Sequence, residues 1–258
     1  MVLNFSARQI VKYVFQEILF KKIKLIICVD VIFSLFMFGT EFLIANKYLA
    51  ILLSILISIP ASISLVYIAL SSNDNLTNDF KNIIKAIQEG FFQLLTVKLF
   101  YIGIALLFAF LLFIIFMKTQ FLGGILGIII GTFMLIIFDF ATYMSILKHL
   151  KPVAAFKEGY AKAKQYWKLI VKIYLLMMLI QLVVLLPVIL ISGFSLYSQI
   201  NNSTGIQPDI MILLSEMLLP IIFFKIISGV LSLMKDFCII TICIDSIKKS
   251  DENFIQSS

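Results

Sequence analysis

Six long runs of apolar residues alternate with short polar segments along the chain. A window of about 19 residues places these runs at 25–44, 49–70, 95–117, 121–147, 169–194 and 221–244. Because about 20 apolar residues are needed to cross a hydrocarbon layer about 30 Å thick, each run predicts one transmembrane helix. The pattern therefore predicts an all-α membrane protein with six transmembrane helices.

The last apolar region is longer than one helix needs. Apolar character extends from Ile210 to Ile244, and Pro220 interrupts it. Proline lacks a backbone donor and clashes with the preceding turn, so we expect the sixth span to begin after it. Residues 210–219 are then expected along the outer interface or as a re-entrant segment.

Composition excludes two other classes of protein. The chain has 258 residues, of which 62% are hydrophobic and 14% charged, and its mean hydropathy is +1.09. Six spans leave only short connections, which are too small for an aqueous catalytic domain. The net charge of +7 comes from basic residues placed between apolar runs, so it indicates membrane orientation rather than nucleic-acid binding.

Basic residues mark one side of the membrane. They gather before the first run, between the second and third, between the fourth and fifth, and after the sixth, while the opposite connections carry only Lys47 and Lys118. Short loops rich in lysine and arginine stay on the cytoplasmic side. We therefore predict a multi-pass protein of the inner, cytoplasmic membrane with both termini in the cytoplasm.

An amphipathic segment precedes each odd-numbered run, and the three segments share a short motif. The second and third copies read Ala-Ile-Gln-Glu-Gly-Phe at 86–91 and Ala-Phe-Lys-Glu-Gly-Tyr at 155–160, and residues 15–17 match them in the first copy. Ser6 and Gln9 have the spacing of a capping box at the start of the first segment. The chain is thus predicted to be one integral membrane domain of three tandem units, at about 5–72, 78–148 and 151–248, each an interfacial amphipathic helix followed by a transmembrane hairpin.

Several of these motifs resemble a known family. Asp139-Phe140 is followed by Tyr143, Pro152, the motif at 155–160, and Trp167-Lys168-Leu169 at the start of the fifth run. Over residues 79–190 the chain resembles the YciC-type proteins and the membrane domain found beside some glycerophosphodiester phosphodiesterases. That resemblance implies a six-span, all-helical fold and assigns no catalytic residues to the membrane part.

Four charged residues fall at membrane depth and form the candidate intramembrane polar site: Asp30, Asp139, Lys235 and Asp236. Burying a charge in hydrocarbon costs about 2.5 kcal/mol or more unless it is paired or hydrated. We predict an ion pair between Asp139 and Lys235, with Asp236 and Asp30 lining a polar interior. The alternative interpretation is that all four stabilise the structure and handle no substrate.

The connection before the fifth run carries six lysines and the only tryptophan, and a seventh lysine, Lys172, lies at the start of that run. Its candidate contacts with anionic lipid head groups are Lys157, Lys162, Lys164, Lys168 and Trp167. The same charges are also expected of any cytoplasmic loop, as orientation signals. The predicted partners are the lipid bilayer, with anionic head groups and other membrane proteins as further candidates.

Residues suited to metal binding or catalysis are few. Cys28, Cys238 and Cys243 have no metal-ligand spacing, and His149 is the only histidine, so no cofactor or metal site is predicted. Without a recognisable nucleophile and base, an intramembrane enzyme is the weakest of three hypotheses. The first is a non-catalytic membrane protein that organises or partners other components, and the second is a permease or transporter subunit with a proton- or cation-handling interior.

Overall fold

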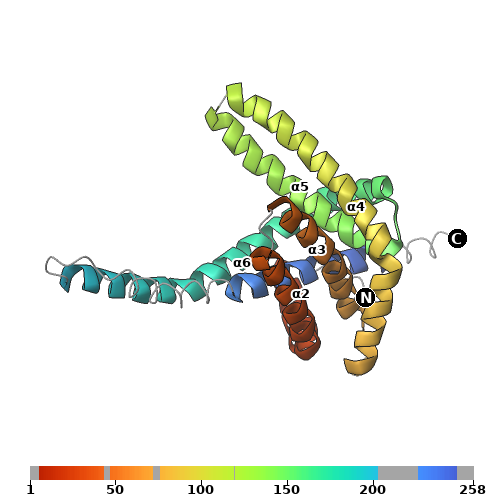
Figure 1. Cartoon of the computed structure of the whole chain (residues 1–258), viewed down its shortest axis with the longest axis horizontal. Coiled ribbons are helices and arrows are strands. Elements are labelled where there is room, and N and C mark those ends of the chain that lie inside the picture. The colour runs from red at the N-terminus through yellow and green to blue at the C-terminus, as the bar shows by residue number, and fades with distance from the viewer. Residues whose placement is uncertain (1–5, 44–46, 72–75, 119, 203–225, 249–258) are drawn as a thin grey trace. The chain divides into compact units, whose positions relative to one another are not determined.

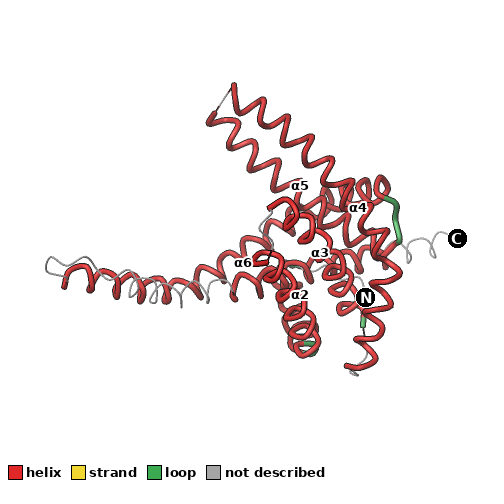
Figure 2. The backbone as a smooth tube through the Cα atoms, viewed as in Figure 1, coloured by secondary structure: helices red, strands yellow, loops and turns green. Residues whose placement is uncertain are grey.

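A computed structural model describes residues 6–43, 47–71, 76–118, 120–202 and 226–248, and nearly all of these residues are helical (Figure 2). The chain divides into two compact units, which are described separately. The larger unit comprises Met1–Trp167 with Asp236–Ser258, and the smaller one comprises Lys168–Lys235. Segments 44–46, 72–75 and 203–225 lie outside the described residues, and with them the predicted break at Pro220 and the predicted outer segment at 210–219.

The first amphipathic helix begins at the predicted capping box. The Gln9 amide donates to Ser6 Oγ at 3.4 Å, and the Ser6 amide donates to Gln9 Oε1 at 2.8 Å, which confirms the box. The α-helix α1 (Ala7–Tyr13) continues as a π-helix, η1 (Val14–Phe20), with Ile10, Val14 and Ile18 buried. A turn at Lys21 and Lys22 separates this helix from the one that follows.

Five further helices follow in chain order: α2 (Ile23–Leu43), α3 (Lys47–Leu70), α4 (Leu76–Lys118), α5 (Gln120–Lys148) and α6 (Pro152–Asn202) (Figure 1). A C-terminal helix is described over Ile226–Lys248. Within the described residues, five segments are long and apolar enough to cross a membrane: Leu52–Leu70, Asp79–Met117, Leu126–Lys148, Pro152–Leu186 and Ile226–Lys248. Apart from short turns, the described residues are helical, which confirms the predicted all-α class, and the five apolar helices agree with the predicted membrane protein.

Helices α4 and α6 are longer than the sequence pattern predicts. The pattern predicts separate helices for the second and third amphipathic segments, but each is continuous with the span that follows it. A helix, once formed, gains one backbone hydrogen bond for each added residue, and no proline stands at either junction to stop it. The 43 residues of α4 measure about 64 Å at 1.5 Å per residue, so part of this helix must lie outside the hydrocarbon layer.

One core cluster of the larger unit lies between α3, α4 and α5. Its buried residues are Ile59, Ile63, Leu94, Val97, Tyr101 and Ala141. Large apolar side chains on the outer faces are instead exposed, among them Phe110 on α4 at 62% and Ile128 on α5 at 72%. Such an outer surface is stable against lipid tails rather than water, which agrees with the membrane assignment.

Two glycines bring amphipathic segments close to the preceding hairpin. A Cβ atom on Gly159 of α6 would lie 2.5 Å from the Cβ of Ala141 on α5 and 2.8 Å from its Cα and N atoms. A Cβ atom on Gly90 of α4 would lie 3.3 Å from the Cδ1 of Ile63 on α3. Both glycines belong to the short motif shared by residues 86–91 and 155–160, and at both places the motif lies against the preceding helix.

In the smaller unit, one polar contact joins α6 to the C-terminal helix. Gln181 Nε2 donates to Ser228 Oγ at 2.9 Å, and both residues lie in segments apolar enough to span a membrane. A polar pair at that depth satisfies both groups without water.

Candidate functional site

A lysine that the sequence pattern does not single out is bound at membrane depth. Lys98 of α4 donates from Nζ to Ser58 Oγ at 2.7 Å and to Ser62 Oγ at 3.4 Å, both on α3. Ser58 lies 12 residues before the end of α3 at Leu70, which is about 18 Å along the helix. The Lys98 ammonium is therefore held inside the bundle rather than extended to its rim.

The two serines are arranged to accept this charge. Ser58 Oγ donates its own proton to the carbonyl of Ile55 at 2.6 Å, and Ser62 Oγ donates to the carbonyl of Ser58 at 2.8 Å. Each hydroxyl donates its proton to a carbonyl of α3, so the lone pairs of its oxygen are left to accept from Lys98. The arrangement places two hydroxyl oxygens where they stabilise the Lys98 ammonium.

Two carboxylates contribute negative charge near the Lys98 ammonium. Asp139 on α5 and Asp236 on the C-terminal helix both interact electrostatically with Lys98. Tyr143, one turn beyond Asp139, is fully buried and hydrogen-bonded to Asp236. The cluster of Ser58, Ser62, Lys98, Asp139, Tyr143 and Asp236, called here the buried polar cluster, joins four helices of the larger unit. Tyr143 is buried, and the other five residues are half-buried.

Aromatic rings border the polar cluster. Tyr101, one turn beyond Lys98 on α4, stacks on Phe138 of α5 with ring centroids 4.9 Å apart. Phe156 of α6 contacts both rings, with centroids 6.3 Å from each. The Tyr101 hydroxyl is buried and has no hydrogen-bond partner among the described residues.

The predicted intramembrane residues are placed differently from one another. Asp139 and Asp236 belong to the buried polar cluster, whereas Asp30 is exposed on α2. Lys235 is half-buried on the C-terminal helix and belongs to the smaller unit, so its predicted pairing with Asp139 stays a prediction.

Sequence reasoning misses Lys98 because it lies near the start of the third apolar run, where it is counted with the orientation charges that precede that run. The available signal is the pair Ser58 and Ser62, which lie one turn apart on one face of an apolar helix.

The predicted lipid-contact residues lie on the first part of α6. Lys157, Lys164 and Lys168 are exposed, Lys162 is half-buried, and Trp167 is 46% exposed. The side that packs inward consists of small residues, Ala155, Gly159 and Ala163, all buried. The larger residues Val153 and Tyr160 of the same segment are exposed at 55% and 47%.

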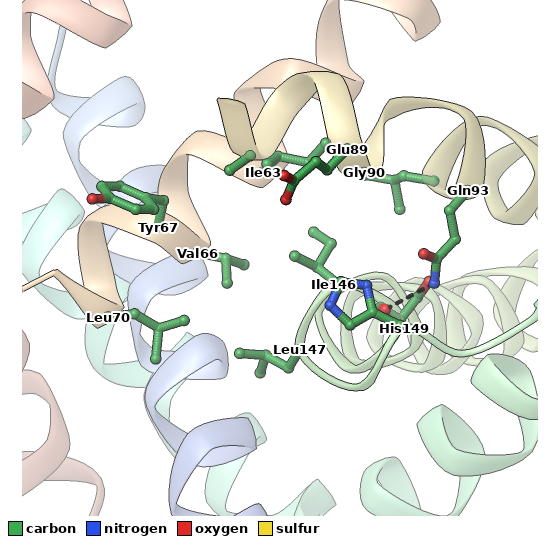
Figure 3. Close-up of a pocket in the computed structure, with 13 residues that line it drawn as sticks. Ile63, Val66, Tyr67, Leu70, Glu89, Gly90, Gln93, Ile146, Leu147 and His149 are labelled. Atoms are coloured by element: carbon green, nitrogen blue, oxygen red, sulfur yellow. Dashed lines mark hydrogen bonds between the residues drawn. The ribbon is translucent and has the colours of Figure 1, made fainter. Parts of the chain in front are cut away.

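Two cavities of about 270 Å³ each are described in the larger unit. One lies between α4 and α5 and is lined almost wholly by apolar groups, including Phe138 and Gly131. The other opens where α3 and α5 end and is lined by both polar and apolar residues, among them Glu89, Gln93 and His149 (Figure 3). Neither cavity is lined by Lys98, Asp139 or Asp236.

The second cavity, called here the interfacial cavity, is built around the end of α5. His149 adopts a left-handed backbone with φ of 51°, and the Leu150 amide donates back to the carbonyl of Ser145 at 3.3 Å. This is the Schellman form of helix termination. Gln93 Nε2 donates to the carbonyls of Ser145 and Leu150 at 3.3 and 3.2 Å, so α4 fixes the position of this turn.

Metal chemistry finds no support in the part of the chain that the structure describes. No group of three or more histidine, cysteine, aspartate or glutamate side chains there is arranged to hold an ion. Cys238 and Cys243 are buried as free thiols on the C-terminal helix, and Cys28 is exposed on α2.

Comparisons with known proteins add no relative from which a role could be transferred. The resemblance over residues 79–190 therefore stays a prediction based on its motifs. No family model, curated protein or solved structure matches this chain.

Proposed function

We propose that the chain is a non-catalytic, multi-pass protein of the cytoplasmic membrane that organises or partners other membrane components. The proposal rests on how the charged side chains at membrane depth are bound. Lys98 binds Ser58 and Ser62, Tyr143 binds Asp236, and neither described cavity reaches these groups. Buried polar groups whose partners come from neighbouring helices serve to hold those helices together.

The proposed topology has six spans in three tandem units with both termini in the cytoplasm. Helix α2, with 21 residues, supplies the span beyond the five given above. The repeat is supported by the two motif glycines, because Gly90 packs on Ile63 of the first hairpin and Gly159 packs on Ala141 of the second. Each contact joins an amphipathic segment to the second helix of the hairpin before it.

The contact surface in this proposal is the outward side of the first part of α6. Lys157, Tyr160, Lys164 and Trp167 are exposed there at intervals of three or four residues, which places them along one side of the helix. Lysines that alternate with aromatic rings suit the membrane–water interface, where the rings enter the head-group layer and the amines reach phosphate or an acidic partner.

Photo-crosslinking in native membranes tests this surface. A photoreactive residue at Lys157 or Lys164 is expected to give discrete adducts, with a partner protein or with anionic lipid, that disappear when Tyr160 and Trp167 are replaced by alanine. The control position is Ile128, which is 72% exposed on the membrane face of α5 and should give only diffuse lipid adducts. Equal adduct patterns at Lys157 and Ile128 would contradict the proposal.

The second candidate is a permease or transporter subunit with a proton- or cation-handling interior. It is favoured by one observation, the presence of two carboxylates and one lysine close together on three helices that are apolar enough to span a membrane. Ionisable groups at that depth line proton and cation pathways in many membrane proteins. The buried Tyr101 hydroxyl would supply a further polar group on such a path.

Flux measurements separate the two candidates. Purified protein in liposomes loaded with a pH-sensitive dye is expected to give no more proton leak than protein-free liposomes under an imposed potential. A leak that Asp139→Asn abolishes, while Asp30→Asn leaves it intact, would overturn the first proposal in favour of transport. Asp30 is the matched control because it is an exposed carboxylate on α2, outside the buried polar cluster.

A further inference from the structure

Two candidate spans end beside the interfacial cavity, Leu52–Leu70 of α3 and Leu126–Lys148 of α5. The ends of membrane spans are expected at the depth of the lipid head groups. Its walls include the apolar side chains of Ile63, Val66 and Leu70 from α3 and of Ile146 and Leu147 from α5. A space at the end of two spans, apolar on one side and polar on the other, matches the boundary between acyl chain and head group.

Polar groups face this space from α4 and from the turn after α5. Figure 3 shows the Glu89 carboxylate of α4 and the His149 imidazole on opposite sides of the Ile146 side chain. Glu89 has a distant in-helix partner, Lys85, at 3.9 Å, and both side chains are largely exposed. Such an exposed pair is worth little energetically, so the carboxylate is available to another cation.

The repeat indicates which cation this position binds. In the third unit, Glu158 precedes the packed Gly159 and forms a 3.1 Å ion pair with Lys148, the last residue of α5. Lys148 stands seven residues after Ala141, the residue that Gly159 contacts. A lysine ammonium from the preceding helix thus satisfies the motif glutamate.

The same construction in the second unit lacks the lysine. Glu89 precedes Gly90, Gly90 contacts Ile63, and the residue seven positions after Ile63 is Leu70, the last residue of α3. Leu70 lines the interfacial cavity. Where the third unit places an ammonium, the second therefore offers an apolar side chain and an open space.

The backbone at His149 is a second, independent feature of this cavity. Its left-handed conformation is the one usually taken by glycine at this point of a Schellman turn, and it is sterically strained for a residue that carries a Cβ atom. A residue whose backbone is strained and whose imidazole lines a cavity indicates a functional site. Its ring N–H can donate to a phosphate oxygen.

We propose that the interfacial cavity binds a zwitterionic phospholipid with a primary ammonium head group. The ammonium occupies the place that Lys148 takes in the third unit and pairs with Glu89. The phosphate lies toward His149, and the start of one acyl chain follows the apolar wall at Ile63, Val66 and Ile146. The inference goes beyond the proposed function, because it concerns a different surface from the lysine–aromatic side of α6.

Lipid-dependent thermal stability of the delipidated, full-length protein tests the site. We expect added phosphatidylethanolamine to raise the unfolding temperature more than equal amounts of phosphatidylglycerol or phosphatidylcholine. Phosphatidylglycerol lacks the ammonium, and the quaternary ammonium of phosphatidylcholine cannot donate a hydrogen bond to Glu89. Glu89→Gln is expected to weaken phosphatidylethanolamine binding by about tenfold or more, since it removes a charge-assisted hydrogen bond.

Two further variants make the result specific. Leu70→Lys places in the second unit the ammonium that Lys148 supplies in the third, so it should remove the preference for phosphatidylethanolamine while leaving the unliganded protein folded. Glu17→Gln is the matched control, because Glu17 also pairs with a lysine of its own helix turn, Lys21, yet does not line the cavity. That variant should bind as the unmodified protein does.

Three outcomes would overturn the proposal. The first is equal stabilisation by all three lipids, and the second is an undiminished phosphatidylethanolamine preference in both Glu89→Gln and Leu70→Lys. The third is an equal shift with free ethanolamine at the same concentration, which would assign the site to a soluble amine. Failure of these tests leaves the crosslinking and flux results unaffected, because neither measurement involves Glu89 or Leu70.

Discussion

Replacing Gly159 with alanine is expected to destabilise the packing of α6 on α5 by about 3 kcal/mol or more. The added methyl group would lie 2.5 Å from the Cβ of Ala141 and 2.8 Å from two of its main-chain atoms. A flexible side chain could rotate away from such an approach, but helix backbone cannot, so the two helices must separate. The expected result is a large drop in unfolding temperature and in yield of monodisperse protein from membranes.

Matched glycines supply the control for this experiment. At Gly103 on α4 and Gly127 on α5, an added methyl group would meet no atom within 4 Å, so alanine there should be neutral or slightly stabilising by helix propensity. Ala141→Gly should restore only part of the loss in Gly159→Ala, since two of the close atoms belong to the backbone. Unchanged stability of Gly159→Ala would show that α5 and α6 do not approach as described.

Replacing Lys98 with methionine is expected to cost about 3–5 kcal/mol, because it removes a cation that interacts electrostatically with both Asp139 and Asp236 at membrane depth. Methionine keeps the length and apolar stem of lysine, so the loss reflects charge rather than volume. Thermal unfolding in mild detergent and the fraction of protein inserted in the membrane measure the effect.

A second substitution distinguishes charge balance from other causes. Asp139→Asn in the Lys98→Met background should recover a substantial part of the lost stability, since it removes one of the two negative charges that Lys98 balances. Lys85→Met is the matched control, because Lys85 lies on the same helix with its side chain 74% exposed, and it should change stability little. Loss of stability in the double variant equal to that of Lys98→Met would remove Asp139 from the cluster.

Much of the secondary structure follows from local pattern. Apolar runs of 20 or more residues predict the helices described at α3, α5 and the C-terminal segment, and Ser6 with Gln9 predicts the start of α1. These features depend only on neighbours in the chain and on lipid as the solvent. The separation of amphipathic segments from spans is predicted less well, because polarity changes along α4 and α6 without any residue that stops a helix.

The candidate site is predictable only in part. Asp139 and Asp236 can be found because carboxylates within apolar runs stand out by composition alone. Lys98 lies near the start of its apolar run, where a lysine usually extends to the interface, so its position gives no reason to place it inside. Its binding to Ser58 depends on how α4 lies against α3, a contact between residues 40 positions apart.

By itself, the sequence determined that the chain suits lipid rather than water, that it is helical, and that a short motif recurs in it. Each of these conclusions follows from the periodicity and polarity of residues close together in the chain. Only the tertiary structure decided which glycine carries the close contact, which charge enters the bundle, and where a cavity opens beside Glu89. Gly127 and Gly131 have the more familiar spacing for helix packing, yet it is Gly159 that meets backbone. Such choices depend on distances between helices, and no pattern within one helix specifies them.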